Sequence, residues 1–206
     1  PNPDPEKVAQ VLIEAIRRAG LSVLPWSEAA ENLLARLRFL CREQPDGGWP
    51  DVSESVLLNT LEDWLLPYLT GMSRFSHLNR LDIYNILKSR LDWPQQQALD
   101  RLAPERIEVP SGSKIRIDYS VDPPVLAVKL QEMFGQKTTP AILEARLPLL
   151  LHLLSPARRP VQVTRDLASF WQNGYPEVKK DLKGRYPKHP WPDDPLSAPP
   201  TRHTKL

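Results

Sequence analysis

The hydrophobic periodicity of the chain changes near Glu105, and this change constrains the fold more than any other feature. Before it, apolar residues recur at the three- and four-residue spacing of amphipathic helices. After it, Ile115 and Ile117 alternate with charged residues, as in a strand with one buried face. We therefore expect an α+β fold, in which a helical part over residues 1–104 precedes a small mixed or antiparallel sheet with short helices over residues 105–186.

The apolar spacing within residues 1–104 predicts five short helices with brief connections, an arrangement that is typical of a small bundle. Asp4 and Ser27 stand where the N-caps of the first two helices are expected. The apolar residues of the first helix follow helical spacing. We expect all of them to face the core: Val8, Val11, Leu12, Ala15, Ile16 and Ala19.

The other three helices are predicted from caps and breakers. Asp51, followed three residues later by Glu54, resembles a capping box for a third helix that should continue to Pro67. A fourth helix is expected over residues 78–91 and a fifth over residues 92–103, where apolar residues again recur at helical spacing.

The apolar runs within residues 105–186 predict a hairpin followed by buried strands. Residues 110–113 form a turn signal between two alternating runs, and 125–128 and 149–154 are continuous apolar runs that we expect to be buried strands. Residues 161–163 could add another strand. Two short helices should follow: one capped by Asp166 and ended by Gly174, the other over 177–183 and ended by Gly184.

Proline dominates the end of the chain. Residues 187–206 contain six of the 23 prolines, so we expect an extended tail with no core of its own. The chain begins with Pro1 rather than methionine, and we therefore expect it to be a processed or excised piece of something longer.

Several functional classes are disfavoured by composition. Apolar residues make up 41% of the chain, which is enough for a core. No apolar run approaches the roughly 20 residues that span a membrane, and no secretion signal is visible. The single Cys41, which we expect to be a small core residue, excludes an internal disulfide. We expect a cytoplasmic protein with no membrane contact.

No catalytic, cofactor or metal motif stands out. The string Gly135-Gln136-Lys137-Thr138 lacks the adjacent Gly-Lys pair of a phosphate loop and the glycine five residues before it. The four histidines are far apart in sequence, and no carboxylate spacing singles out a catalytic pair. We expect no catalysis, cofactor or metal in this segment itself.

Positive charge gathers in the second half. Residues 1–110 carry 12 basic and 16 acidic side chains, whereas residues 111–206 carry 15 basic and nine acidic. Near the C-terminus the basic residues are interspersed with aromatic ones, a mixture that suits phosphate neutralisation and stacking on unpaired bases. We expect contacts to single-stranded nucleic acid from Arg158, Arg159, Arg165, Lys179, Lys180, Lys183, Arg185 and Lys188.

A structural role for the same residues stays open. Phe170 and Trp171 could belong to the core, and Tyr186 and Trp191 could hold the tail against the domain. The basic side chains could be solvated, or could be balanced by acidic protein.

The segment from Lys183 to Pro195, with Leu154–Pro160 and Gln131–Gly135, resembles the C-terminal end of HrpB-type bacterial DEAH-box RNA helicases. The resemblance also takes in Gly20–Leu24 and Trp64–Pro67 and spans essentially the whole chain. It implies a parent enzyme with two RecA-like motor domains followed by winged-helix, helical-bundle and OB-like modules. The ATP and magnesium sites would then lie in the motor, outside this segment.

The resemblance implies an accessory C-terminal region of an ATP-dependent RNA helicase. We expect it to contact single-stranded RNA through its basic half and to adjoin the upstream motor domains. The alternative is a docking module that braces the motor or recruits a partner protein.

Overall fold

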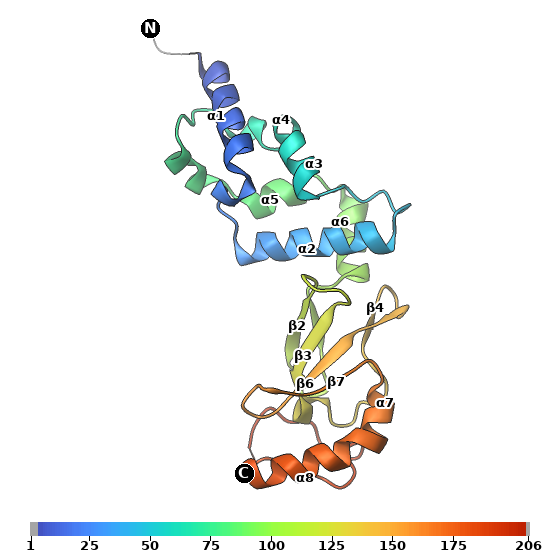
Figure 1. Ribbon diagram of the computed structural model, residues 1–206. Helices are drawn as coiled ribbons and strands as arrows, with labels where there is room; N and C mark the ends of the chain where they lie inside the picture. The colour runs from blue at the N-terminus through green and yellow to red at the C-terminus, as the bar shows by residue number, and fades with distance from the viewer. Residues whose placement is uncertain (1–3, 205–206) are drawn as a thin grey trace. The chain divides into compact units, whose positions relative to one another are not determined.

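The computed structural model describes residues 4–204. The chain divides into two compact units, Pro1–Asp100 and Arg101–Leu206, which we call the helical unit and the sheet unit (Figure 1). Together they form the expected α+β fold, with helices first and a mixed sheet with a C-terminal helix second.

The helical unit consists of short helices joined by brief loops. Their bounds are α1 Pro5–Ala19, η1 Leu21–Val23, α2 Glu28–Glu43, α3 Glu54–Asn59, α4 Leu61–Trp64, η2 Leu66–Tyr68, η3 Phe75–Arg80, α5 Ile83–Lys88 and α6 Trp93–Leu102, the last of which contains the boundary between the units.

The predicted caps of the first two helices are confirmed. The Asp4 carboxylate accepts a hydrogen bond from the Glu6 N–H at 3.1 Å, and the Ser27 hydroxyl accepts one from the Ala30 N–H at 3.1 Å. Gly20 follows α1 with a φ of 89°, a conformation that suits glycine. Local sequence chemistry therefore sets the bounds of α1 and the start of α2.

The buried face of α1 differs from the expected one. The residues that face the core are Ala9, Leu12, Ile13 and Ile16, whereas Val11 is 70% exposed and Ala19 is also exposed. The prediction that Val11 and Ala19 face the core was wrong. Two apolar stripes run side by side along this helix, and the unit buries only one of them fully.

The third predicted helix breaks in the middle, at Thr60, into α3 and α4. The expected capping box does not form, because the Asp51 carboxylate accepts from the Ser53 N–H at 2.9 Å and Ser53 takes the N-cap position. The fourth predicted helix is also divided, into η3 and α5, because Leu81 adopts an extended conformation between them. The fifth helix is confirmed as α6.

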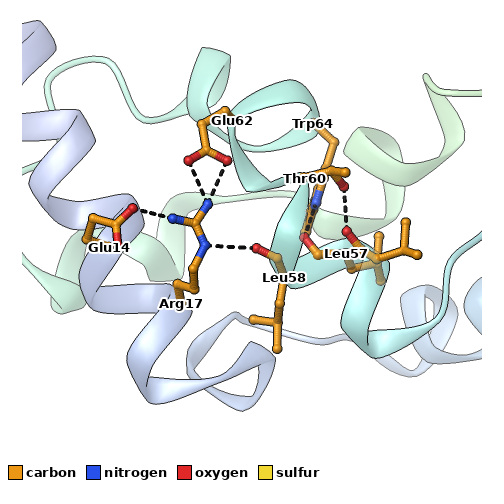
Figure 2. A network of polar contacts seen from close by, with 8 residues as sticks. Glu14, Arg17, Leu57, Leu58, Thr60, Glu62 and Trp64 are labelled. Carbon is orange, nitrogen blue, oxygen red and sulfur yellow. Dashed lines mark hydrogen bonds and ion pairs between the residues drawn. The ribbon is translucent and has the colours of Figure 1, made fainter.

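Side chains satisfy the backbone where α3 breaks (Figure 2). A break leaves carbonyls of the preceding turn without their helical N–H donors. The Trp64 indole N–H donates to the Leu57 carbonyl at 2.9 Å, and Arg17 Nε donates to the Leu58 carbonyl at 3.1 Å. Arg17 also holds both Glu62 carboxylate oxygens at 2.6 Å and pairs with Glu14, so α1 is joined to both α3 and α4.

The sheet unit is built on a five-stranded mixed sheet. Its order is β1-β2-β3-β6-β7, with β3 and β6 parallel and the other neighbours antiparallel. The strands are β1 Arg106–Glu108, β2 Lys114–Asp118, β3 Val125–Lys129, β6 Leu150–Leu154 and β7 Pro160–Thr164. The short strands β4 Ala141–Ile142 and β5 Leu147–Pro148, which were not anticipated, form a separate pair.

The predicted hairpin is confirmed, and the two apolar runs form strands as predicted, but burial is incomplete: in β6 only Leu151 and Leu153 are fully buried, and Ala127 of β3 is exposed. Ile107 pairs with Ile115 across the β1–β2 hairpin, and Gly112 adopts a φ of 83° in the turn. The parallel pair β3 and β6 carries the two continuous apolar runs, as expected for strands at the centre of a sheet.

The last helices do not end at Gly174, contrary to expectation. α7 Leu167–Ser169 continues through a π-helical turn, Phe170–Gly174, into α8 Tyr175–Arg185. In the wider turn the Tyr175 N–H donates to the Phe170 carbonyl. Pro176 is tolerated because the first turn of a helix needs no N–H from it.

Gly174 is required by a close approach rather than as a helix stop. A Cβ at this position would lie 2.7 Å from the Phe170 ring. Phe170 is one of four buried aromatic residues whose rings contact one another, with centroids 5.2–6.5 Å apart: Phe134, Phe170, Trp171 and Tyr175. This cluster packs the helical segment onto the sheet unit.

The proline-rich end of the chain is held against the sheet unit by one buried side chain and by backbone hydrogen bonds. The Trp191 ring is only 7% exposed, and its N–H donates to the Tyr186 carbonyl at 2.9 Å. The Gly135 N–H donates to the Pro195 carbonyl at 2.9 Å, and the Thr201 N–H donates to the Gln131 carbonyl at 3.0 Å. Among residues 4–204, no helix has the length and apolarity needed to cross a membrane.

Candidate functional site

The strongest candidate site is a depression on α8 of the sheet unit, which we call the lysine groove. It has a volume of about 310 Å³ and is lined by Tyr175, Pro176, Lys179, Lys180, Lys183 and Asp193. Lys179, Lys180 and Lys183 lie three, four and seven residues after Pro176, and this spacing places side chains on one face of a helix. The helix therefore brings three ammonium groups to one surface.

Asp193, from the segment after α8, supplies the only carboxylate among the groove-lining residues of the described chain. It pairs with Lys179, whose side chain is 18% exposed, whereas the Asp193 side chain is fully exposed. The hydrogen bond and positive charge of Lys179 lower the pKa of the Asp193 carboxyl, with a smaller contribution from the charge of Lys183. One carboxylate thus faces three cations, and the groove keeps an excess of positive charge.

Tyr175 fixes the position of Asp193 through the backbone next to it. The buried Tyr175 hydroxyl donates to the Pro192 carbonyl at 2.8 Å. Burial raises the pKa of this hydroxyl, and the charge of Asp193 raises it further, so the tyrosine stays neutral. It acts as a hydrogen-bond donor that holds residues 192–193 at the edge of the groove.

The two acidic residues of α8 do not line the groove. Glu177 and Asp181 are four residues apart, and both are exposed. Glu177 is three residues from Lys180, so its carboxylate lies beside the lysine face, whereas Asp181 is turned further from it. Asp193 is therefore the carboxylate that a polyanion in the groove would meet directly.

The structure brings together three of the eight expected nucleic-acid-binding residues. Arg158 and Arg159 lie exposed in the turn between β6 and β7, and the exposed Arg165 precedes α7. Arg185 is the last residue of α8 and Lys188 follows it, but neither lines the groove. Within residues 4–204, no hydrogen bond or ion pair joins these five side chains to the lysine groove.

The expected aromatic stacking partners are buried. Phe170 is 4% exposed and Trp171 is 5% exposed, and the Trp171 N–H donates to the Gln136 carbonyl at 2.8 Å. The alternative interpretation, in which these rings form the core and Trp191 holds the tail, is the one that the structure supports. The groove offers cations for phosphates and no free aromatic face for bases.

Sequence reasoning missed the part played by Tyr175, Pro176 and Asp193. The spacing of Pro176 with Lys179, Lys180 and Lys183 is visible in the sequence, and it could have separated these lysines from the other basic residues. Asp193 had no such signal, since its pairing with Lys179 depends on the path of the chain after α8.

Other chemical sites are weaker. Within residues 4–204 no group of three or more His, Cys, Asp or Glu side chains is placed to hold a metal ion. Cys41 is half-buried, and its thiol donates to the Pro50 carbonyl at 3.1 Å. Burial, with a further contribution from the charge of Asp51, raises the pKa of this thiol, which disfavours the nucleophilic thiolate.

Comparison with known proteins gives a consistent result. A family model described as "ATP-dependent helicase C-terminal" matches residues 64–195. The ATP-dependent RNA helicase HrpB of Escherichia coli (strain K12) is 52% identical over 206 residues, which cover 98% of this chain and 25% of the relative.

Two solved structures are similar as well. The crystal structure of the E. coli DExH-box NTPase HrpB superposes with a TM-score of 0.91 at 49% identity, covering 99% of this chain and 25% of that one. The crystal structure of the Escherichia coli DEAH/RHA helicase HrpB gives a TM-score of 0.77 at 47% identity, over 92% of this chain and 24% of that one. The chain spans about a quarter of the length of these relatives.

Proposed function

Since this chain belongs to the HrpB-type family of ATP-dependent helicase C-terminal regions, we propose that it is the accessory C-terminal region of a longer bacterial RNA helicase and contacts RNA through the lysine groove. ATP hydrolysis, with its magnesium ion, would belong to the preceding part of such a helicase, in the cytoplasm. The region itself would bind and position RNA without catalysis.

The observation that carries this proposal is the convergence of Lys179, Lys180 and Lys183 on one groove that holds a single carboxylate. Ammonium groups bind phosphates as point charges, and their contacts carry little sequence information. Because Tyr175, the aromatic residue among the groove-lining residues of the described chain, is buried, the contact is expected to follow the backbone of a single strand rather than its bases. The proposal predicts weak sequence preference and strong salt dependence.

The test is RNA binding by this chain, measured by fluorescence anisotropy of a labelled single-stranded RNA over a series of salt concentrations. Replacing Lys179, Lys180 and Lys183 by alanine should weaken binding. It should also reduce the slope of log affinity against log salt concentration by about 2, because each phosphate contact on a single strand contributes roughly 0.7.

A matched control removes three exposed cations from the helical unit: Lys7→Ala, Arg18→Ala and Arg80→Ala. The control should leave the slope close to that of the unmodified chain. The proposal fails if the chain binds no RNA at low salt, or if the control lowers the slope as much as the groove variant does. An equal loss would mean that only net charge matters.

A second candidate function, docking onto the helicase motor or onto a partner protein, is favoured by a different observation. The helical unit exposes large apolar side chains that its own core does not use, including Val11, Phe75 and Trp93. Contiguous exposed apolar surface marks protein interaction sites, and Val11 and Phe75 line one groove. The two functions concern different units and are compatible.

A further inference from the structure

The helical unit carries an apolar groove between α1 and the segment that leads into η3. Its volume is about 470 Å³, and its lining residues are Lys7, Val8, Val11, Leu12, Ala15, Ser73, Arg74 and Phe75. Leu12 is buried, whereas Val11 is 70% exposed and Phe75 is 43% exposed. Apolar surface of this kind gains free energy when another apolar surface covers it.

The groove follows from the sequence of α1 and is not a gap in the core. Ala9, Leu12, Ile13 and Ile16 form the stripe that the helical unit buries. Val8, Val11 and Ala15 continue the apolar surface around one side of the helix at three- and four-residue spacing, where no described residue of the unit covers Val11. Such a stripe is the surface that an apolar side chain of an amphipathic segment contacts.

The charged side chains among the residues that line the groove are all basic. Lys7 and Arg74 line it, both are exposed, and no acidic side chain is among its lining residues in the described chain. Complementary charge at the rim of an interface sets orientation and favours one kind of partner. The occupant should therefore carry apolar residues with carboxylates beside them.

We propose that this groove docks an amphipathic segment of the preceding part of the helicase chain, with apolar residues on Val11 and Phe75 and carboxylates near Lys7 and Arg74. The proposal rests on the proposed function, in that it takes this chain as the C-terminal region of a longer helicase. The relatives are about four times as long as this chain, which covers 25% of them, and the matching family is a C-terminal one.

A covalently attached partner is the occupant that such a groove favours. The groove is moderate in size, and a separate protein would need additional surface to form a stable complex through it. A segment of the same chain has an effective concentration in the millimolar range when its linker is short and flexible, so a small apolar contact is sufficient.

Photocrosslinking in the full-length helicase tests the proposal. Val11→p-benzoylphenylalanine should give a crosslink, after irradiation and mass spectrometry, to a peptide that precedes residue 1 of this sequence and contains Asp or Glu. The same substitution at Val121, an exposed valine of the sheet unit, serves as the matched control and should give no crosslink to that peptide. A crosslink to a second copy or to another protein, or none at all, overturns the proposal.

Hydrogen exchange gives a second measurement. Val11→Asp places a carboxylate in the apolar groove, so the docked segment should leave, and the amides of Ser73 and Phe75 should exchange at least about tenfold faster in the full-length helicase. Val121→Asp should change neither rate. Unchanged rates in Val11→Asp contradict the docking.

The two proposals fail separately. Loss of RNA binding by the lysine-groove variants tests the proposed RNA contact, and Val11→Asp should leave that binding unchanged. If the lysine variants bind RNA normally while the crosslink to the preceding part forms, the RNA contact is wrong and the docking stands. If the crosslink is absent while the lysines affect RNA binding, only the docking fails.

Discussion

The two units differ in how much aromatic surface they leave in water. In the sheet unit, Phe134, Trp171 and Tyr175 are at most 5% exposed and pack ring against ring. In the helical unit, Phe75 and Trp93 are 43% and 70% exposed. The helical unit also buries aromatic rings, since Phe39 and Trp64 are 1% and 3% exposed, but it leaves other rings largely in water. The buried rings of both units serve internal stability, whereas the exposed rings of the helical unit are available for contact with other molecules.

The largest expected effect concerns the aromatic core of the sheet unit. Phe134→Ala removes a fully buried ring from the cluster and should destabilise the sheet unit by about 3–5 kcal/mol. Phe75→Ala, the matched change in the helical unit, should cost less than about 1 kcal/mol, because much of that ring is already in water. Chemical denaturation followed by circular dichroism measures both.

Hydrogen exchange then shows where each change acts. The Phe134 variant should speed the exchange of amides in β3 and β6 while leaving α2 slow. If Phe75→Ala proves as costly as Phe134→Ala, the exposed rings are part of the core of their unit and the contrast between the units is lost.

A smaller effect is expected at the break between α3 and α4. Trp64→Phe keeps a buried ring but removes the N–H that donates to the Leu57 carbonyl, which should cost about 1–3 kcal/mol because that carbonyl is left without its donor. Trp93→Phe makes the same change at an exposed position and should be within about 0.5 kcal/mol of the unmodified protein. Equal costs at the two positions, in thermal or urea denaturation, would mean that the indole N–H does not support the break.

A modest effect on RNA affinity is expected in the lysine groove. Asp193→Asn removes the carboxylate that faces the three lysines and should raise RNA affinity about twofold to fivefold at low salt. Asp181→Asn, which removes the same charge from a residue of α8 that does not line the groove, should raise it less. Anisotropy titrations compare the two, and equal gains would show that the groove has no special role.

The smallest expected effect is that of pH. Because Lys179 lowers the pKa of the Asp193 carboxyl below its usual value of 3.8, the ion pair is present above that pKa and is lost only as pH falls through it. Burial, with the charge of Lys129, lowers the pKa of His189, which is therefore neutral near pH 7. RNA affinity should vary by less than about twofold between about pH 6 and pH 8. A steep rise below about pH 6.5 would point to a histidine contact instead.

Local signals in the sequence predicted the elements whose cause is local. Asp4 and Ser27 cap their helices, the β1–β2 hairpin forms around its turn, and the apolar run of β6 becomes a strand. Each depends on residues within a few positions of one another. The sheet is mixed because the two strands formed by apolar runs, β3 and β6, are parallel while the other neighbouring strands are antiparallel.

The features that were predicted wrongly from the sequence depend on contacts between residues that are distant in the chain. α3 ends at Thr60 although its apolar spacing continues, and Arg17 from α1 satisfies the Leu58 carbonyl there, 41 positions away in sequence. The exposure of Val11 depends on which stripe of α1 the other helices cover, and spacing alone cannot decide that. In the candidate site, helix spacing could have grouped the lysines, but only the fold brings Asp193 to Lys179.

The π-helical turn of Phe170–Gly174 determines which way the lysines point. An α-helix rotates by about 100° per residue, so the one extra residue that a wide turn takes in would otherwise turn everything after it by that angle. The turn absorbs this offset, and Leu167 before it and Leu182 after it both remain buried. It thereby keeps the residues after the turn in the rotational position about the helix axis that places the lysines on the groove. A variant that lost it without losing a residue would point Lys179, Lys180 and Lys183 in a new direction while keeping the same sequence of charges.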